Sequence, residues 1–312
     1  MKRGIVYAGM AGAAWGGVFL VPKLLPEFSP LMLSCGRYLL YGAVSLLIAV
    51  PNARRLLKML TKNDIVTLVK LALTGNLIYY VLLASAVQLA GIATASLIVG
   101  VLPVTITFAG RQDAGAVPLS RLVWPLLMVV LGIVCINIDI FFLDSARETS
   151  FASVGLGVAC AFGALLCWTK FATDNARHLK SCRFNSGDWS TLWGVTTGVL
   201  SALIWSIASA LSWSKMSVAL PEKRWLMFWG INLTAAVFAS WFGNWMWNAS
   251  SRRLPLTLGG QLIVFETLFA LLYGFIYLQR LPTMMEIVAI LLLIGGVCWT
   301  VQRHASSNGE VS

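Results

Sequence analysis

Long, uninterrupted apolar runs constrain this chain more than any other feature of its sequence. A helix needs about 20 apolar residues to cross a hydrocarbon core of about 30 Å. A transmembrane β-strand needs only about ten residues of alternating polarity, so continuous runs favour helices. The sequence predicts an all-α membrane protein with ten transmembrane helices, at Ile5–Val21, Leu31–Val50, Ile65–Gln88, Ile92–Gly110, Leu122–Ile138, Ser153–Thr173, Trp189–Leu211, Leu226–Ala249, Leu256–Tyr277 and Thr283–Gln302.

The overall composition agrees with a chain that lies mostly in lipid. Hydrophobic residues make up 58% of the 312 residues and charged residues only 11%, against about 25% charged in soluble domains. No long polar stretch separates the apolar runs, so we expect no soluble domain. The helix count depends on two short joins, Gln88–Gly91 and Leu254–Pro255.

The basic residues are distributed unevenly between the two ends of the expected helices. With the N-terminus in the cytoplasm, the outer ends hold six basic residues: Lys23, Arg147, Lys215, Lys223, Arg224 and Arg280. Arg37 lies within a span, and the other 16 of the 23 lie at cytoplasmic ends, several of them in an expected loop at Lys170–Asp188. Cytoplasmic loops of membrane proteins are enriched in Lys and Arg. We therefore expect both termini in the cytoplasm of an inner-membrane protein, and the net charge of +11 does not indicate nucleic-acid binding.

Motifs for enzymatic chemistry or metal binding are missing from the sequence. The two histidines, His178 and His304, fall in an expected cytoplasmic loop and in the C-terminal tail. No Cys/His spacing typical of a metal site and no nucleotide-binding loop occurs. We expect no cofactor, no metal and no enzymatic activity. No cleavable signal peptide is expected either.

The chain shows signs of internal duplication. At an offset of 164 residues several landmarks coincide, and at 153 residues Trp15 falls on Trp168. The 164-residue pairs are Gly110 with Gly274, Pro118 with Pro282, Gly132 with Gly296, and Pro103 with Thr267. Residues 1–150 and 151–312 would then each hold five spans. Because five is odd, consecutive copies enter from opposite sides, which is the inverted repeat typical of secondary transporters.

The C-terminal segments Phe265–Gly274, Leu281–Pro282 and Ile294–Val297 carry a family resemblance. They are similar to the EamA-type repeat of the drug/metabolite transporter superfamily, and Trp15–Gly16 and Arg37 also match habitual positions. Thr267 stands where proline is usual, and Gln279–Arg280 replaces the usual Gly-Glu turn. The resemblance implies a ten-helix exporter or permease with a central cavity lined mainly by the first four helices of each copy.

Two charged residues lie inside predicted spans, where they are costly and point to function. Glu266 is about ten residues into the ninth span, near the midplane, where desolvation disfavours the charged form. It serves either proton or substrate coupling, or a structural hydrogen bond. Arg37 lies about 9–10 Å below the outer face, so it either takes part in function or extends to the interface.

Polar and aromatic side chains share a face of the eighth span and of its counterpart, the third. Lipid-facing amides would be unpaired, which costs several kcal/mol, so these faces meet protein or water. The alternatives are interfacial belts or polar contacts between helices. The candidate cavity residues are Trp15, Asn76, Tyr79, Tyr80, Trp241, Asn244, Trp245, Asn248 and Gln261, and Gly100 and Pro103 form a candidate hinge.

These features favour a secondary transporter over an intramembrane enzyme or a non-transporting scaffold. Its partners would be the lipid bilayer, a small-molecule substrate and, with Glu266, protons. A cavity with Trp, Tyr and Asn suits small metabolites such as amino acids, including aromatic ones. A single acidic group near the midplane suits cations or drugs instead, and both substrate classes remain open.

Overall fold

The computed structural model describes residues 1–144, 151–210 and 220–309, and this part of the chain contains helices and no strand. Leu211, Arg147 and Lys215, which the sequence places at span ends, lie outside the described residues. The α-helices of the first half are α1 (Lys2–Gly16), α2 (Val21–Leu24), α3 (Pro30–Ala49), α4 (Ala53–Met59), α5 (Lys62–Ala72), α6 (Ile78–Ala90), α7 (Ile92–Gly100), α8 (Leu102–Ala109) and α9 (Leu119–Asp144). Those of the second half are α10 (Phe151–Ser181), α11 (Ser186–Ala210), α12 (Glu222–Thr234), α13 (Gly243–Ser251), α14 (Leu256–Leu262), α15 (Val264–Leu278) and α16 (Met284–Gly309).

Four shorter helical segments link these α-helices. They are the 3₁₀ turns η1 (Gly17–Leu20) and η2 (Val50–Asn52) and the π-helical segments η3 (Leu73–Leu77) and η4 (Ala235–Phe242). Segment η3 joins α5 to α6, and η4 joins α12 to α13. At the 164-residue offset, Leu73–Leu77 falls on residues 237–241, which lie inside η4. The same rare irregularity therefore occurs at matching places in the two halves, and such π segments are frequent at functional sites.

Within the described residues, eight helices are long and apolar enough to cross a membrane, and they correspond to eight of the ten predicted spans. The predicted first span falls on α1, η1 and α2, and the predicted fourth span falls on α7 and α8. Both joins that determine the count are present. Gly91 separates α6 from α7 with φ 88°, a conformation that glycine adopts without strain. Residues 252–255 separate α13 from α14.

Two sequence expectations about the cytoplasmic side are wrong. The expected loop Lys170–Asp188 is mostly helix, because α10 continues to Ser181 and α11 begins at Ser186. Residues Phe171, Ala176 and Leu179 are buried, so the helix continues where its apolar face still packs on protein. A fall in hydropathy indicates where a helix leaves the membrane, and the helix itself can continue beyond that point. His178 is therefore helical.

His304 is likewise not in an extended tail. It lies in α16 with only 2% of its surface exposed, and its Nε2 atom is 2.9 Å from the Thr257 hydroxyl. The Nδ1 atom lies 2.9 Å from the Thr300 carbonyl oxygen one turn earlier. Both ring nitrogens thus have partners, and the side chain helps to join α16 to α14.

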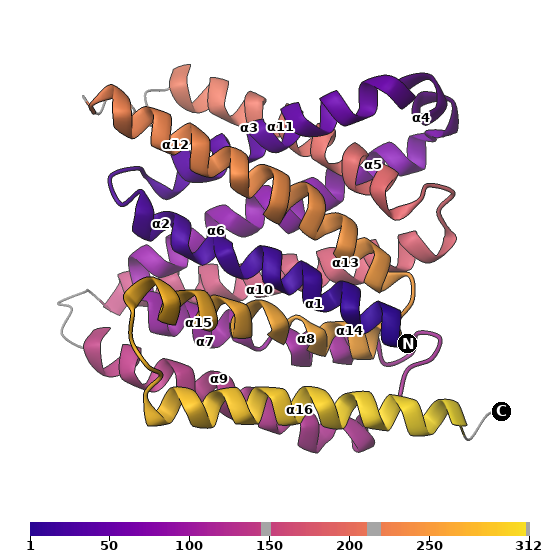
Figure 1. The fold of residues 1–312 in the computed structure, drawn as a ribbon, viewed down its shortest axis with the longest axis vertical. Helices are drawn as coiled ribbons and strands as arrows, with labels where there is room; N and C mark the ends of the chain where they lie inside the picture. Colours follow the sequence, from indigo (N-terminus) through magenta and orange to yellow (C-terminus); the bar gives the residue numbers. More distant parts are fainter. Residues whose placement is uncertain (145–150, 211–219, 310–312) are drawn as a thin grey trace.

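The helices form a layered bundle with both termini at the same end (Figure 1). Helices α3 and α11 pack at one edge, and α9 and α16 pack at the other. Between them, α1 packs on α13 and α15, while α10 packs on α6 and α7. Each half thus places its first helix against the third and fourth spans of the other half. This packing between the two halves brings residues that are distant in the sequence together in the middle of the bundle.

Candidate functional site

Glu266 is positioned where α1 and α15 approach closely. A Cβ atom added at Gly12 would lie 2.6 Å from the Cβ of Phe265 and 2.9 Å from the nitrogen of Glu266. Gly16, one turn later, would place a Cβ atom 2.7 Å from the nitrogen of Ala270. The two glycines let the backbones touch, and this contact holds the third residue of α15 close to the bundle centre.

The Glu266 side chain is half-buried and makes no hydrogen bond or ion pair with the residues that the structure describes. Its electrostatic neighbours are the guanidinium of Arg37 and the ring of Tyr79. A carboxyl group without a fixed partner is free to exchange one ligand for another. This property separates Glu266 from Glu27 and Glu286, which are both paired with arginine.

Arg37 faces the interior of the bundle. Its Nε atom donates a 2.9 Å hydrogen bond to the hydroxyl of Ser240 in η4, and its guanidinium lies 5.5 Å from the Tyr38 ring centroid. Tyr80 is within electrostatic range of both Arg37 and Tyr38. We call Arg37, Tyr38, Tyr79, Tyr80 and Glu266 the midplane cluster. Its members come from α3, α6 and α15.

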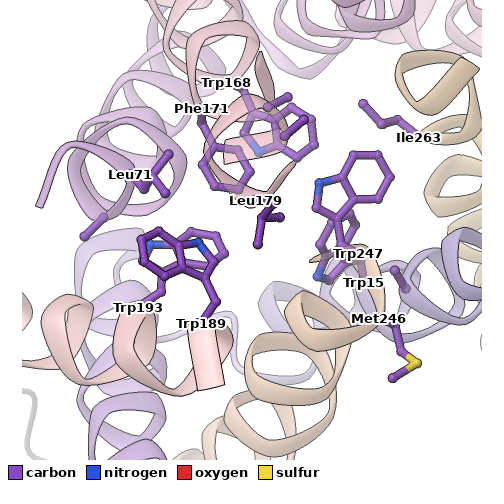
Figure 2. Close-up of a cluster of buried hydrophobic side chains, with 14 of the residues drawn as sticks. Trp15, Leu71, Trp168, Phe171, Leu179, Trp189, Trp193, Met246, Trp247 and Ile263 are labelled. Carbon is purple, nitrogen blue, oxygen red and sulfur yellow. The ribbon is translucent and has the colours of Figure 1, made fainter. Parts of the chain in front are cut away.

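Three tryptophans form an aromatic layer beside this cluster. The ring centroids of Trp15 and Trp247 are 5.4 Å apart, and Trp168 lies 6.2 Å from the first and 6.3 Å from the second. Tyr79 is 6.5 Å from Trp168, which connects the layer to the midplane cluster. Figure 2 shows these indoles coming together from different helices, with Ile263 nearby. Sequence reasoning placed only Trp15 in the site, although its match to Trp168 was a usable signal.

The predicted amide stripe is engaged in contacts between helices. Asn244 donates to the Tyr41 hydroxyl at 3.2 Å, and Asn76 donates to the Thr197 hydroxyl at 3.0 Å. Both amide side chains are buried. In this conformation they act as polar contacts between helices, the alternative that the sequence left open. Asn76 lies in η3 and pairs with α11, while Asn244 lies in α13 and pairs with α3.

A second set of bonds lies closer to the end that carries the termini. Asn175 donates to the Asn248 carbonyl oxygen at 2.9 Å and accepts from the Trp189 indole at 3.0 Å. The Trp241 indole donates to the Thr191 hydroxyl at 3.0 Å. Together with the Asn76 and Asn244 bonds, these form what we call the polar seam. It joins α3, α10, α11, η3, η4 and α13 through buried or partly buried side chains.

The remaining predicted site residues are dispersed. Trp245 lies 5.3 Å from Trp241 at the edge of the seam. Gln261 is fully buried and accepts a hydrogen bond from Thr300 in α16, away from the midplane cluster. Gly100 ends α7, and Pro103 lies at the second position of α8 after the break at Val101. The chain is therefore interrupted at the predicted hinge.

A well-formed cavity lies elsewhere. A space of about 690 Å³ opens between α1, η1 and α2 on one side and α12 and η4 on the other. None of the predicted cavity residues lines it. Within the described part of the chain, no group of three or more His, Cys, Asp or Glu side chains is arranged to hold a metal ion. The candidate site is thus the midplane cluster with its aromatic layer, which brings together one carboxyl group, one guanidinium and several aromatic rings.

The eight long apolar helices of the described residues define a multi-pass membrane protein. Residues 2–138 match the model of the EamA-like transporter family. The Inner membrane protein YtfF of Escherichia coli (strain K12) is 34% identical over 317 residues, covering 97% of this chain and 96% of that protein. The chain therefore belongs to the EamA-like transporter family, within the drug/metabolite transporter superfamily, and it is a membrane transporter.

A solved crystal structure has a similar fold. It aligns with a TM-score of 0.72 at 18% sequence identity, and the match covers 95% of each chain. At this identity the likeness concerns the arrangement of the helices only.

Proposed function

We propose that this protein is a secondary transporter that exports small metabolites, such as amino acids, by alternating access with proton exchange at Glu266. The observation that carries the proposal is the half-buried carboxyl group of Glu266, which has no hydrogen bond or ion pair within the described residues. Membership of the family supports the proposal that the protein is a transporter. The carboxyl group of Glu266 supports the proposal that transport is coupled to proton exchange.

The coupling rests on competition for one carboxyl group. Charged groups inside a bilayer are costly, so Glu266 is stabilised by a proton or by a positively charged part of the substrate. The guanidinium of Arg37 lies within electrostatic range of Glu266, so it would compete with a proton and with a substrate cation for the same carboxyl group. Proton entry would then release the substrate's cationic group, and inward proton flow would drive outward transport.

The proposed architecture is a pair of inverted five-helix repeats, residues 1–150 and 151–312, with both termini in the cytoplasm of an inner-membrane protein. Three observations support it. The first helix of each half packs on the third and fourth spans of the other. Segments η3 and η4 occur at matching positions. Both termini lie at one end of the bundle.

The polar seam would then be the cytoplasmic gate, and it would separate when the site opens to the cytoplasm. The interruption between α7 and α8 at Gly100–Pro103 would allow that movement, because a broken helix can bend without losing regular backbone bonds.

The coupling role is tested with Glu266→Gln in proteoliposomes. Export driven by a pH gradient is expected to fall at least about tenfold, while exchange of labelled substrate down its gradient continues, because glutamine keeps the shape but cannot release a proton. Glu222→Gln, which alters an exposed carboxylate at the start of α12, serves as the matched control. Full gradient-driven export by Glu266→Gln would refute proton coupling, and loss of both activities would indicate direct binding of a cation.

The second candidate is a multidrug exporter for cationic compounds. It is favoured by the aromatic layer next to a carboxyl group, since cations bind aromatic faces. Growth of overexpressing cells on toxic amino-acid analogues and on cationic drugs separates the candidates. Resistance to the analogues alone supports the first, and resistance to the drugs alone supports the second.

A further inference from the structure

The cavity of about 690 Å³ is a groove between two helical walls. Small residues create it, since Ala13, Ala14 and Gly17 line one wall and Gly230, Ala235 and Ala239 line the other. Its volume lies within the range of about 300–1,000 Å³ that is usual for ligand sites. Such a space beside a bilayer is not expected to stay empty.

The polar side chains in the lining offer nothing to a polar ligand. Among the described residues these are Thr234 and Tyr273. The Thr234 hydroxyl donates to the Gly230 carbonyl oxygen at 3.0 Å, and the Tyr273 hydroxyl donates to the Ala13 carbonyl oxygen at 3.0 Å. Both donors are therefore used by the backbone. The part of a ligand that lies in the groove must be apolar.

The groove faces lipid and is longer than one leaflet of the hydrocarbon core is deep. Met10 and Phe238 in its lining are 40% and 60% exposed, so the groove opens at the outer surface of the bundle. From Met10 to Leu24 the helix rises about 21 Å, at about 1.5 Å per residue. Half of the hydrocarbon core is about 15 Å. An acyl chain inserted from the end near α2 would lie in the groove along its length.

The end of the groove near α2 is basic. Arg224 bonds the Glu27 carboxylate at 2.6 Å and the Leu24 carbonyl oxygen at 3.1 Å, which joins α12 to α2. The hydrogen bond from Arg224 holds the pKa of Glu27 below its usual value, so this carboxylate stays ionised and neutralises the arginine. Lys23 and Lys223 are exposed, against one exposed acid, Glu222. These three exposed residues together carry one net positive charge.

We propose that the groove binds a membrane phospholipid, with one acyl chain between α1 and η4 and the phosphate at Lys23. A long apolar groove with a basic end complements a molecule that has a long hydrocarbon chain and an anionic phosphate. The site is separate from the midplane cluster, and lipid binding there does not depend on the transport mechanism.

Filling the groove tests the acyl-chain position. Full-length protein in nanodiscs of equal parts phosphatidylethanolamine and phosphatidylglycerol is extracted with mild detergent, and retained phospholipid is measured by native mass spectrometry. Gly230→Phe places a ring in the groove, and Gly155→Phe is the matched control. A Cβ atom at either glycine meets no atom within 4 Å, so both variants are expected to fold. Retention is expected to fall at least about tenfold in Gly230→Phe only, which corresponds to about two displaced methylenes.

Removing the charge tests the phosphate position. Lys23→Gln is expected to lower retention of both lipids about fivefold, whereas Lys2→Gln, an exposed lysine at the opposite end, leaves it unchanged. Retention by Gly230→Phe equal to that of the unaltered protein would overturn the proposal. The same conclusion follows if the unaltered protein retains no phospholipid, in which case the groove is assigned to the apolar part of a transported compound.

Discussion

At Glu266 the protein holds an acidic side chain inside the candidate membrane span Leu256–Leu278, where a charged group is costly. The contacts of Gly12 and Gly16 with α15 fix the backbone beside it, but no described side chain holds the carboxyl group. Arg37, in contrast, is tied to Ser240. The cation is therefore fixed and the anion is free. That asymmetry suits a site in which the carboxyl group changes partners while the guanidinium sets the local field.

Asn175 provides a test of the polar seam at the residue scale. Asn175→Ala removes one partner from the Trp189 indole and one from the Asn248 side chain, both of which are fully buried. The free energy of unfolding is expected to fall by about 1–3 kcal/mol, because buried polar groups are left unsatisfied. Unfolding in mixed detergent measures it.

Asn63→Ala is the control for this substitution, since Asn63 is exposed, and it should change stability by less than about 0.5 kcal/mol. A double-mutant cycle with Asn248→Ala is expected to give a coupling energy of about 0.6 kcal/mol. A coupling energy of zero would show that the 2.9 Å bond between the two amides contributes nothing to stability.

At the scale of helices, glycines decide how closely spans of the two halves approach. A Cβ atom at Gly42 would lie 2.5 Å from the Cα atom of Gly198, and one at Gly198 would lie 2.4 Å from the Cα atom of Gly42. At the other edge, Gly132 meets Leu293 and Gly296 meets Val129. Leu293 and Val129 are also 164 residues apart, so these two contacts would be equivalent under the proposed repeat.

The crossing of α3 and α11 yields a prediction for glycine substitution. Gly42→Ala is expected to destabilise the protein by about 1–3 kcal/mol, because the new methyl group meets backbone that cannot move aside without separating the helices. Gly155→Ala has open space around its Cβ position and should gain up to about 1 kcal/mol from helix propensity. Thermal unfolding in detergent compares the two variants, and equal midpoints would contradict a tight crossing.

At the scale of the whole molecule, ion pairs join segments that are distant in the sequence. Arg55 and Asp188 form two bonds of 2.8 Å, and Arg177 bonds Asp113 at 3.0 Å. These pairs connect the end of the second span with the start of the seventh, and α10 with the turn after α8. They lie at the end of the bundle that carries both termini. If that end of the bundle opens, these ion pairs must either break or move together with the segments that they join.

The proposed orientation predicts the location of two reporter fusions. An enzyme that is active only outside the cytoplasm is attached after His304 or after Asp144. The fusion after His304 is expected to be inactive and the one after Asp144 active, with at least about a tenfold difference, because the excess of basic residues retains the terminal side in the cytoplasm. Equal activities, or the reverse order, would refute the topology.

The sequence by itself determined the class of the molecule. Membrane-spanning helices follow from hydrocarbon thickness and backbone hydrogen bonding, which act on each segment separately. For the same reason hydropathy placed Glu266 near the middle of its span and identified the joins at Gly91 and Pro255. Residues Phe265–Gly274 carried the family resemblance, which the match to the EamA-like transporters confirmed.

Only the tertiary structure decided which side chains meet. The Arg37–Ser240 bond spans 203 residues, and the Asn76–Thr197 bond spans 121. Neither bond can be predicted from the sequence of a single helix. A polar side chain on a helix face is equally compatible with a water-filled cavity and with a hydrogen bond to a neighbouring helix. The burial of His304 and the continuation of α10 to Ser181 were missed for the same reason. Hydropathy measures how favourably a side chain transfers from water into lipid. Which side chains contact one another depends instead on how the helices cross.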